Sequence, residues 1–513
     1  MDEAKPFFSS EIPEAVEPQR RIPHEKGAAW LFLALGYFFC CAFPMSKRPL
    51  LAVFFLIALY VVSFPVLLRG RARFGRVQKL VLLSAALALL PPLLWDNTGD
   101  AFLCLLYALT AYVYLFYAAT GNCLEEGLST LVGADLVRAL ILFPFSSIGK
   151  LIPALAARGE KSIGKQLLKV LLGLLIAVIP TAVVLALLSY DSGFRSIVDG
   201  LFRFRRDDLA IQLGRILFTL PVSMYLFGLY ASSLRASERD AAAEKARARA
   251  ERRHFIPLVT AAAAVIPLLV VYIIFFVSQW TYYTSAFTGA LPADQSYAEY
   301  ARSGFFELCA VSCINFLAVI CLGRYVRREK EPLRRALCSI FALFSLVLIA
   351  TAVSKLLLYI AHYDLTPDRV YAAWFMGLLT VLFLIVLLAQ FFPGIRALPL
   401  CMAVTVALYL MLALSGPKAQ IARYNVDRYL AGQTKVIDVA LLDSLGDDAI
   451  PEMLRLDAFW AEHAHAPGSH ARGELRIALA RRAAWETDFW RQTFSSRQAD
   501  RLLEKAGYDK EGP

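Results

Sequence analysis

The sequence predicts an all-α polytopic membrane protein, a bundle of about eleven transmembrane helices followed by a small soluble helical domain. Hydrophobic residues make up 58% of the 513 residues and charged residues only 19%, and the mean hydropathy is +0.55. These values lie outside the range of soluble domains. Apolar runs of about 17 to 25 residues recur between charged or Pro/Gly-containing loops, which is typical of helical membrane proteins. Apolar and polar residues do not alternate with a period of two, which argues against an outer-membrane barrel.

The apolar runs define the expected spans in chain order. They are 27–44, 49–68, 80–95, 101–119, 166–189, 209–233, 256–280, 303–323, 336–361, 371–393 and 397–415. Residues 1–26, which are polar and mixed in charge, are expected to form a disordered cytoplasmic tail. Pro91 and Pro92 are expected to kink or end the third span, because proline lacks the amide donor that a helix needs.

Three segments differ from ordinary spans. Segment 133–158 is apolar but interrupted by Arg138, Lys150 and two prolines, so we interpret it as interfacial or re-entrant, with a true crossing as the alternative. Residues 192–206 place apolar side chains on one helix face, which is typical of a helix lying on the membrane surface. The charged, Ala-rich stretch 234–254 is expected to extend the sixth span into water and is a candidate contact for a protein partner.

The charge distribution predicts the orientation. The formal net charge of +11 would suggest nucleic acid in a soluble protein, but the excess lies in short loops between spans, which indicates the positive-inside pattern instead. With a cytoplasmic N-terminus the cytoplasmic loops carry 24 basic residues and the outer loops 8. A crossing at 133–158 would put two basic loops outside, which also favours the re-entrant interpretation. Eleven spans then place the C-terminal domain, 416–513, outside the cytoplasm.

The C-terminal domain is expected to hold three to five helices. Gly432 and Gly446 are typical of helix ends, and the sequence at 495–498 (Ser-Ser-Arg-Gln) fits a capping box before the last helix. The expected apolar core consists of Leu441, Leu442, Leu454, Phe459, Trp460, Trp485, Trp490 and Leu502. This domain is the second candidate contact for a protein partner.

Charged residues inside the apolar spans are the candidate functional site. Glu307 and Lys355 lie within the eighth and ninth spans and Arg215 within the sixth, at similar expected depth in the outer third of the membrane. An ionised side chain in hydrocarbon costs several kcal/mol, so such residues are expected to face a partner or a water-filled cavity. The full set of candidate substrate-binding residues is Arg215, Glu307, Lys355, Asn315, Tyr359 and His362.

This polar layer has two interpretations. It could line a cavity for an anion, a proton or a polar headgroup. Alternatively, Glu307 forms a structural ion pair with Lys355 or Arg215, or these side chains extend to the nearby membrane surface. His463, His465 and His470 lie in a Pro- and Gly-containing loop, which favours a solvated loop over a metal site. No cofactor, metal or catalytic residue is predicted, because no nucleophile–base arrangement, phosphate loop or kinase signature is visible.

Three motifs carry a family resemblance. The sequences YARSGFFELCAVSCINF, LLLYIAHYDLTPDRVYAAWFM and IARYNVDRYL followed by DVALLDSLGDDAIP resemble a bacterial family of multi-pass proteins, the domain-of-unknown-function 4153/4173 group. The likeness covers roughly 120–450. It implies a bacterial plasma-membrane protein with a helical domain after the last span, and it brings no established activity or catalytic residue.

The first function hypothesis is transport or permeation of a small polar or charged solute through the polar layer. The alternative is an envelope-sensing or scaffolding protein in contact with the lipid bilayer and with protein partners, without transport or catalysis. An internal repeat would favour transport, and none is visible in the sequence.

Overall fold

The computed structural model describes the chain in two compact units. The described residues are 25–43, 48–69, 75–125, 131–156, 206–235, 256–278, 305–326, 331–485 and 488–508, with single helical residues at 244 and 248. One unit comprises Met1–Cys41, Thr120–Asn122 and Val137–Arg239, and the other Ala42–Ala119, Cys123–Leu136 and Asp240–Pro513. We call them the first and the second unit.

The first unit is built on the contact between α1 (Glu25–Ala42) and α11 (Arg206–Arg235). The rings of Phe32 and Phe227 meet edge to face with their centroids 6.3 Å apart. One turn further along α1, a Cβ on Gly36 would stand 2.0 Å from the hydroxyl oxygen of Ser223. Only a glycine therefore fits this close crossing, which is how small residues act between membrane helices.

The rest of the described first unit is a broken helical segment. It comprises η1 (Arg138–Leu142), α7 (Phe143–Ser146), η2 (Ile148–Lys150) and α8 (Leu151–Ala156). Tyr225 of α11 donates to the carbonyl of Leu140 at 2.9 Å, and Ser232 donates to the carbonyl of Phe143 at 2.7 Å. The Ser232 hydroxyl also lies 2.9 Å from that of Ser146. These contacts fall in the second half of α11, so the segment is folded over one end of that helix. Its interfacial or re-entrant placement stays a prediction.

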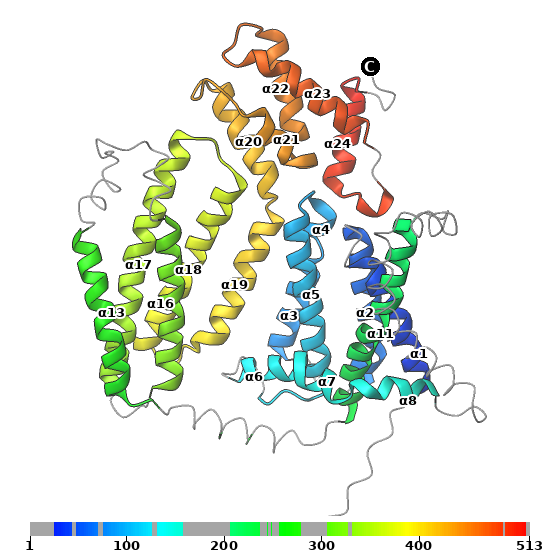
Figure 1. Ribbon diagram of the computed structural model, residues 1–513, viewed down its shortest axis with the longest axis vertical. Helices are drawn as coiled ribbons and strands as arrows, with labels where there is room; N and C mark the ends of the chain where they lie inside the picture. Colours follow the sequence, from blue (N-terminus) through cyan, green and yellow to red (C-terminus); the bar gives the residue numbers. More distant parts are fainter. Residues whose placement is uncertain are drawn as a thin grey trace, which may run out of the picture. The chain divides into compact units, whose positions relative to one another are not determined.

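The second unit contains most of the apolar helices. They are α2 (Pro49–Arg69), α3 (Arg76–Ala88), α4 (Pro91–Leu94), α5 (Thr98–Ala119), α6 (Val132–Val137), α13 (Leu258–Ser278), α16 (Phe305–Tyr325), α17 (Glu331–His362), α18 (Pro367–Phe391) and α19 (Ala397–Leu414). Helices α16, α17 and α18 lie side by side (Figure 1) and share a core in which Phe383 and Ala352 are fully buried. The single β-bridge of the described chain joins Ile256 to Val326, where α13 begins and α16 ends.

The all-α polytopic prediction is confirmed. Ten helical stretches in the described part of the chain are long and apolar enough to cross a membrane, among them Arg76–Leu94, which comprises α3 and α4, and Val132–Leu155, which includes the broken segment; α2 carries a shorter apolar stretch, Pro49–Ser63. As Pro91 and Pro92 predict, α3 ends at Ala88 and a separate short helix begins at Pro91. The predicted span 166–189, the surface helix 192–206, nearly all of the tail 1–26 and most of 234–254 lie outside the described residues.

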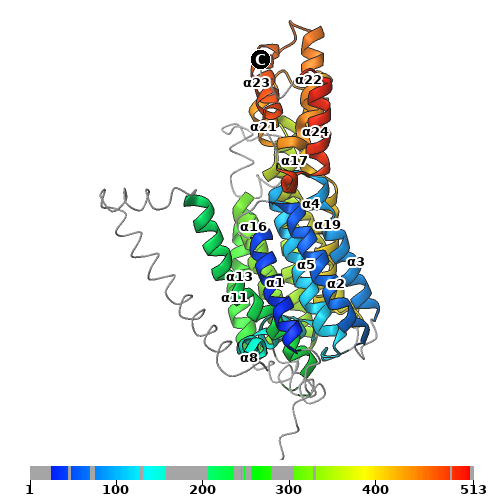
Figure 2. The ribbon, with the colours of Figure 1, turned by 90° about the vertical axis from the view of Figure 1, so that its right-hand side faces the viewer.

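The C-terminal domain is an all-helical cluster at one end of the second unit (Figure 2). Its elements are α20 (Pro417–Leu430), α21 (Val439–Ser444), η4 (Gly446–Ala449), α22 (Ile450–Glu462), α23 (Arg472–Ala483), η6 (Phe489–Arg491) and α24 (Phe494–Lys505). Trp460 is the largest buried side chain, 1% exposed, and donates to the Tyr429 hydroxyl at 2.7 Å. Gly432 and Gly446 adopt φ of +71° and +73° just after α20 and α21, as expected for helix ends.

Two details of the C-terminal domain differ from the sequence prediction. The capping box is formed by Thr493 and Ser496, not by the residues 495–498, because α24 begins at Phe494 and the Thr493 side chain accepts from the Ser496 amide. Trp485 is not in the core: 63% of it is exposed. Trp490 instead packs against Phe54 of α2, with ring centroids 6.0 Å apart. Apolar character alone could not distinguish a core position from this surface.

Three loops of the membrane bundle contact the C-terminal domain and therefore lie on the same side of the second unit. Arg48, before α2, forms a 2.8 Å ion pair with Asp488. The amide of Asp96, before α5, donates to Asp448 at 3.0 Å. The amide of Leu365, between α17 and α18, donates to the side chain of Asn425 in α20 at 2.8 Å. These are three of the five loops that the charge pattern places outside the cytoplasm.

Candidate functional site

The predicted polar layer is divided between the two units. Arg215 lies on α11 of the first unit, is half-buried, and within the described chain its Nε has no hydrogen-bond partner. Lys355 lies on α17 of the second unit and is only 6% exposed. Glu307 lies in the first turn of α16 and His362 ends α17, but the side chains of both are outside the described residues. That Arg215 joins the other two charges stays a prediction.

Asn315 is held in a buried hydrogen-bond chain across three helices. It is fully buried, its Oδ1 accepts from the Tyr272 hydroxyl at 2.7 Å, and its Nδ2 donates to the Ser345 hydroxyl at 2.9 Å. Ser345 in turn donates to the Phe341 carbonyl. Both ends of the amide are thus bonded to protein side chains, which is the arrangement expected of a residue that joins helices.

The Asn315–Ser345 bond also sets the register of α16 against α17. Glu307 precedes Asn315 by eight residues, and Val353 follows Ser345 by eight, so the antiparallel helices bring Glu307 to the height of Val353, two residues from Lys355. Leu308 lies in the same buried cluster as Ala352. The equal depth expected for Glu307 and Lys355 is therefore consistent with the backbone of these two helices.

Tyr359 is covered by a cation. The guanidinium carbon of Arg369 lies 4.0 Å from the centre of the Tyr359 ring and 5.8 Å from that of Tyr363. The two rings meet edge to face at 5.0 Å. One face of Tyr359 is thus occupied by the first turn of α18, in a cation–π arrangement.

The second and third family motifs meet at this loop. Asn425 of α20, 2% exposed, donates to the Leu365 carbonyl and accepts from its amide, both at 2.8 Å. Arg428 donates to the carbonyls of Ile360 at 3.2 Å and Tyr363 at 3.3 Å. A cation on the last carbonyls of a helix is favourable, because these groups have no intrahelical partner and carry the negative end of the helix dipole. The first helix of the C-terminal domain thus caps α17.

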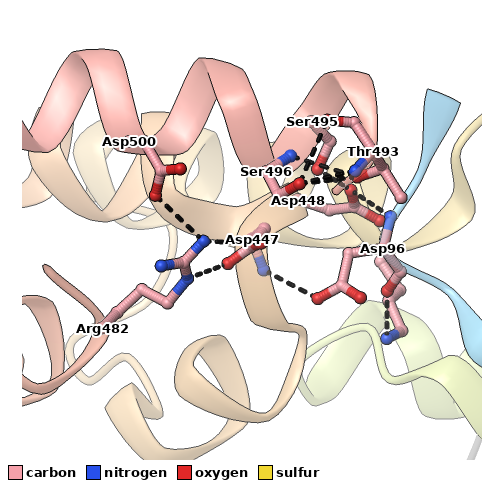
Figure 3. A network of polar contacts seen from close by, with 9 residues as sticks. Asp96, Asp447, Asp448, Arg482, Thr493, Ser495, Ser496 and Asp500 are labelled. Atoms are coloured by element: carbon pink, nitrogen blue, oxygen red, sulfur yellow. Dashed lines mark hydrogen bonds and ion pairs between the residues drawn. The ribbon is translucent and has the colours of Figure 1, made fainter. Parts of the chain in front are cut away.

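A second polar network joins the C-terminal domain to the α4–α5 loop (Figure 3). The Asp96 carboxylate accepts from the Asp447 amide at 3.3 Å, and the Asp96 amide donates to the Asp448 carboxylate at 3.0 Å. Lys418 of α20 donates to the Asp96 carbonyl at 2.8 Å. Next to it, the Trp95 indole donates to the Leu414 carbonyl at 3.1 Å. The loop is therefore bonded to η4 and to the α19–α20 junction at once.

Asp447 and Asp448 have opposite surroundings. The Asp447 carboxylate is bound in a fork by Arg482, through Nε and, at 2.8 Å, through Nη2; Arg482 also contacts Asp500 at 3.2 Å. Asp448, 5% exposed, accepts through Oδ1 from Ser495, while its buried Oδ2 has no partner within the described chain. Burial raises the pKa of Asp448 and the nearby Asp96 charge adds to this, outweighing the hydrogen bonds from Ser495 and the Asp96 amide and the Lys418 charge.

This difference predicts that Asp448→Asn is tolerated. A raised folded-state pKa means that the folded protein loses stability as pH rises from the ordinary Asp range to that pKa. The asparagine side chain can keep both hydrogen bonds that Oδ1 accepts, and it removes the buried charge. We therefore expect Asp448→Asn to be at least as stable as the wild type at pH 7. The gain should vanish below about pH 4. Thermal unfolding of the purified protein between pH 3.5 and 7 measures it. A loss at pH 7 as large as that of Asp447→Asn would contradict the assignment.

The polar contacts continue into the membrane helices. Asp100, in the first turn of α5, is 5% exposed and accepts from Asn97 at 2.8 Å, from Tyr371 of α18 at 2.7 Å and from Tyr409 of α19 at 3.1 Å. Asn97 also donates to the Tyr371 hydroxyl at 2.9 Å. A buried carboxylate on α5 with donors from the α4–α5 loop, α18 and α19 joins the ends of these three helices.

The sequence did not single out these residues. The missed residues are Asp96, Asn97, Asp100, Asp447, Asp448 and Arg482. The available signal was the pair of acid-rich turns, DNTGD beside two apolar spans and GDDAIP inside a family motif. Acids that flank apolar spans are common as solvated turns, so only the fold identifies which of them are buried.

A family model described as a domain of unknown function (DUF4153) matches residues 81–456. The match includes all three motifs and begins earlier than position 120, within α3. No curated protein and no solved structure matches the chain. Since the match covers most of the chain and ten apolar helical stretches occur in its described part, this protein is a multi-pass membrane member of the DUF4153 family.

Proposed function

We propose that the chain is a membrane-anchored sensing or scaffolding protein in which the C-terminal helical domain and the bundle act as one coupled body. The observation that carries this is the chain of contacts from Arg482 through Asp447 to Asp96 in the α4–α5 loop. From this loop, Asn97 and then Asp100 of α5 lead on to Tyr371. A change in the C-terminal domain would reach α18 and α19 through bonded groups rather than through a flexible linker.

Coupling of this kind is reciprocal, so it can be tested from the membrane side. Tyr371→Phe removes the hydroxyl that bonds Asn97 and Asp100, and we expect faster hydrogen exchange at the amides of Asp447 and Ser496. Tyr107→Phe is the matched control, because it removes a bond to Ser84 inside the bundle. The measurement is amide exchange of the full chain in lipid nanodiscs. Equal exchange of the C-terminal domain in both variants would refute the coupling.

Transport through the polar layer is the second candidate, and it is favoured by the burial of Lys355 inside a membrane-spanning helix. The same purified protein in proteoliposomes tests it, with dyes that report protons and small anions. Transport requires a flux that Lys355→Met abolishes while the protein remains folded. The Glu307→Gln and Lys355→Met variants, alone and together, distinguish a structural ion pair from a working site. A loss of protein level in each single variant that recovers in the double variant indicates a structural pair.

We further propose a bacterial plasma-membrane location with the C-terminal domain outside the cytoplasm and with segment 133–158 not crossing. The basic loops support this orientation. The end of α5 and the start of α13 both lie on the side of the second unit opposite the C-terminal domain, so residues 120–257 cross the bilayer an even number of times. If α11 and 166–189 cross, segment 133–158 does not.

Thiol labelling in right-side-out vesicles tests this topology. Lys161→Cys, between segment 133–158 and the span 166–189, is expected to react with an impermeant maleimide only after permeabilisation, like Gln78→Cys in the first turn of α3. Lys435→Cys in the C-terminal domain should react at once. The wild type is the blank for its nine native thiols. Immediate labelling of Lys161→Cys would mean that 133–158 crosses.

A further inference from the structure

Large aromatic side chains are exposed on the connection between α23 and α24. Trp485, Phe489 and Phe494 are 63%, 55% and 61% exposed, although the same domain buries Trp460 completely. We call residues 485 and 488–494 the aromatic connection. Exposed apolar side chains gathered in one short stretch of a well-packed domain mark an interaction surface.

The aromatic connection lies at the level of a membrane helix. Trp490 contacts Phe54 edge to face at 6.0 Å, and Phe54 is five residues, or about 8 Å, into α2. Arg48, directly before α2, pairs with Asp488 at 2.8 Å. The connection is therefore held beside the first turns of this apolar helix at two points.

The part of α2 that it touches is the lipid-facing stripe. Phe54, Ile57 and Val61 recur at helical spacing and are 51%, 44% and 63% exposed. In a helix of this apolar composition, such a stripe faces hydrocarbon. Trp490 thus rests on a surface that is continuous with the lipid-exposed side of the bundle.

We propose that the aromatic connection inserts Trp485, Phe489 and Phe494 into the interfacial region of the bilayer leaflet in which α2 begins. Aromatic rings favour this depth because they combine an apolar body with affinity for the polar interface. Arg491 in the aromatic connection and Arg497 in the first turn of α24 are also exposed, and the Arg497 guanidinium lies 5.8 Å from the Phe489 ring centre. These cations suit lipid phosphates. The C-terminal domain is then anchored to lipid as well as to the helices.

Quenching by brominated lipid tests this. The full chain is placed singly in nanodiscs of phosphatidylcholine and phosphatidylglycerol, with bromine at the 6,7 positions of the acyl chain. The contribution of Trp485 is the difference between the wild type and Trp485→Phe. The matched control is Ile477→Trp in the Trp485→Phe background, since position 477 is 67% exposed on the same domain and lies eight residues earlier, on α23.

We expect bromolipid to quench Trp485 at least about twofold more than the tryptophan at position 477, and aqueous iodide to show the reverse order. Equal bromolipid quenching at the two positions would overturn the proposal. The proposal would also be overturned if iodide quenched Trp485 in nanodiscs that hold one copy but not in nanodiscs at high protein density. That result would indicate that Trp485 contacts a second copy of the chain.

Discussion

Gly416→Ala is expected to loosen the C-terminal domain from the membrane bundle. Gly416 has a φ of +66°, and a Cβ there would stand 2.7 Å from two carbons of the Trp95 ring. The alanine must adopt a left-handed conformation and also displace a rigid indole whose nitrogen is bonded to the Leu414 carbonyl. Backbone strain of this kind costs about 1 to 3 kcal/mol, and overpacking adds about as much.

Gly432→Ala separates the two contributions. Gly432 has a φ of +71° but nothing within 4 Å of its Cβ position, so its alanine variant carries the backbone cost alone. Native-state hydrogen exchange of α20 to α24 in the full-length protein gives the opening free energy of each variant. Gly416→Ala should lower it by about 1 to 3 kcal/mol more than Gly432→Ala. If both variants lose the same amount, the Trp95 contact does not hold the domain.

Arg482→Met should be the most damaging change within the C-terminal domain. Arg482 and Asp447 are 16% and 10% exposed in their side chains, and Asp500 completes the cluster. Burial disfavours the charged guanidinium, but the hydrogen bond to Asp447 and the surrounding carboxylates outweigh this and raise the pKa of Arg482. Its removal leaves a buried carboxylate uncompensated, which costs about 3 to 5 kcal/mol.

Arg481→Met is the control on the neighbouring residue. Its ion pair with Asp443, at 3.1 Å, is 64% and 42% exposed, and such surface pairs contribute about 0 to 1 kcal/mol. The double variant Arg482→Met, Asp447→Asn should recover part of the loss, because the buried charge is removed with its partner. Native-state hydrogen exchange of α22 to α24 gives the opening free energy of all three variants. No recovery in the double variant would mean that packing by the Arg482 side chain, not charge, is lost.

The fold was predictable because the bilayer imposes long apolar runs that are legible in one sequence. Prolines 91 and 92 marked the helix break, and Gly432 and Gly446 marked helix ends, since each acts through local backbone chemistry. The exposed Trp485 was wrongly expected in the core. Trp490, which was also expected there, instead contacts Phe54 of α2, more than 400 positions earlier in the chain, and no local pattern encodes such a contact.

The candidate site was only partly accessible from the sequence. A charged residue within an apolar run, such as Lys355, is easily recognised in the sequence, and the structure shows that Lys355 is buried. Asp100 stood at the edge of its run, where an acid is ordinary. Its three donors lie up to 309 residues from it in the sequence. Helical spacing relates neighbours within one helix, so it could not bring Tyr371 and Tyr409 to this carboxylate.

The contact between Asp96 and Asp448 spans 352 residues, which has a consequence for biosynthesis. A ribosome that adds about 5 to 20 residues each second needs roughly 20 to 70 s to make the intervening chain. During that time the α4–α5 turn is already inserted, but the groups that will bond it do not yet exist. The α4–α5 loop therefore gains these hydrogen bonds only after η4 has been made, and a chain that stops before Asp447 would leave the loop without them.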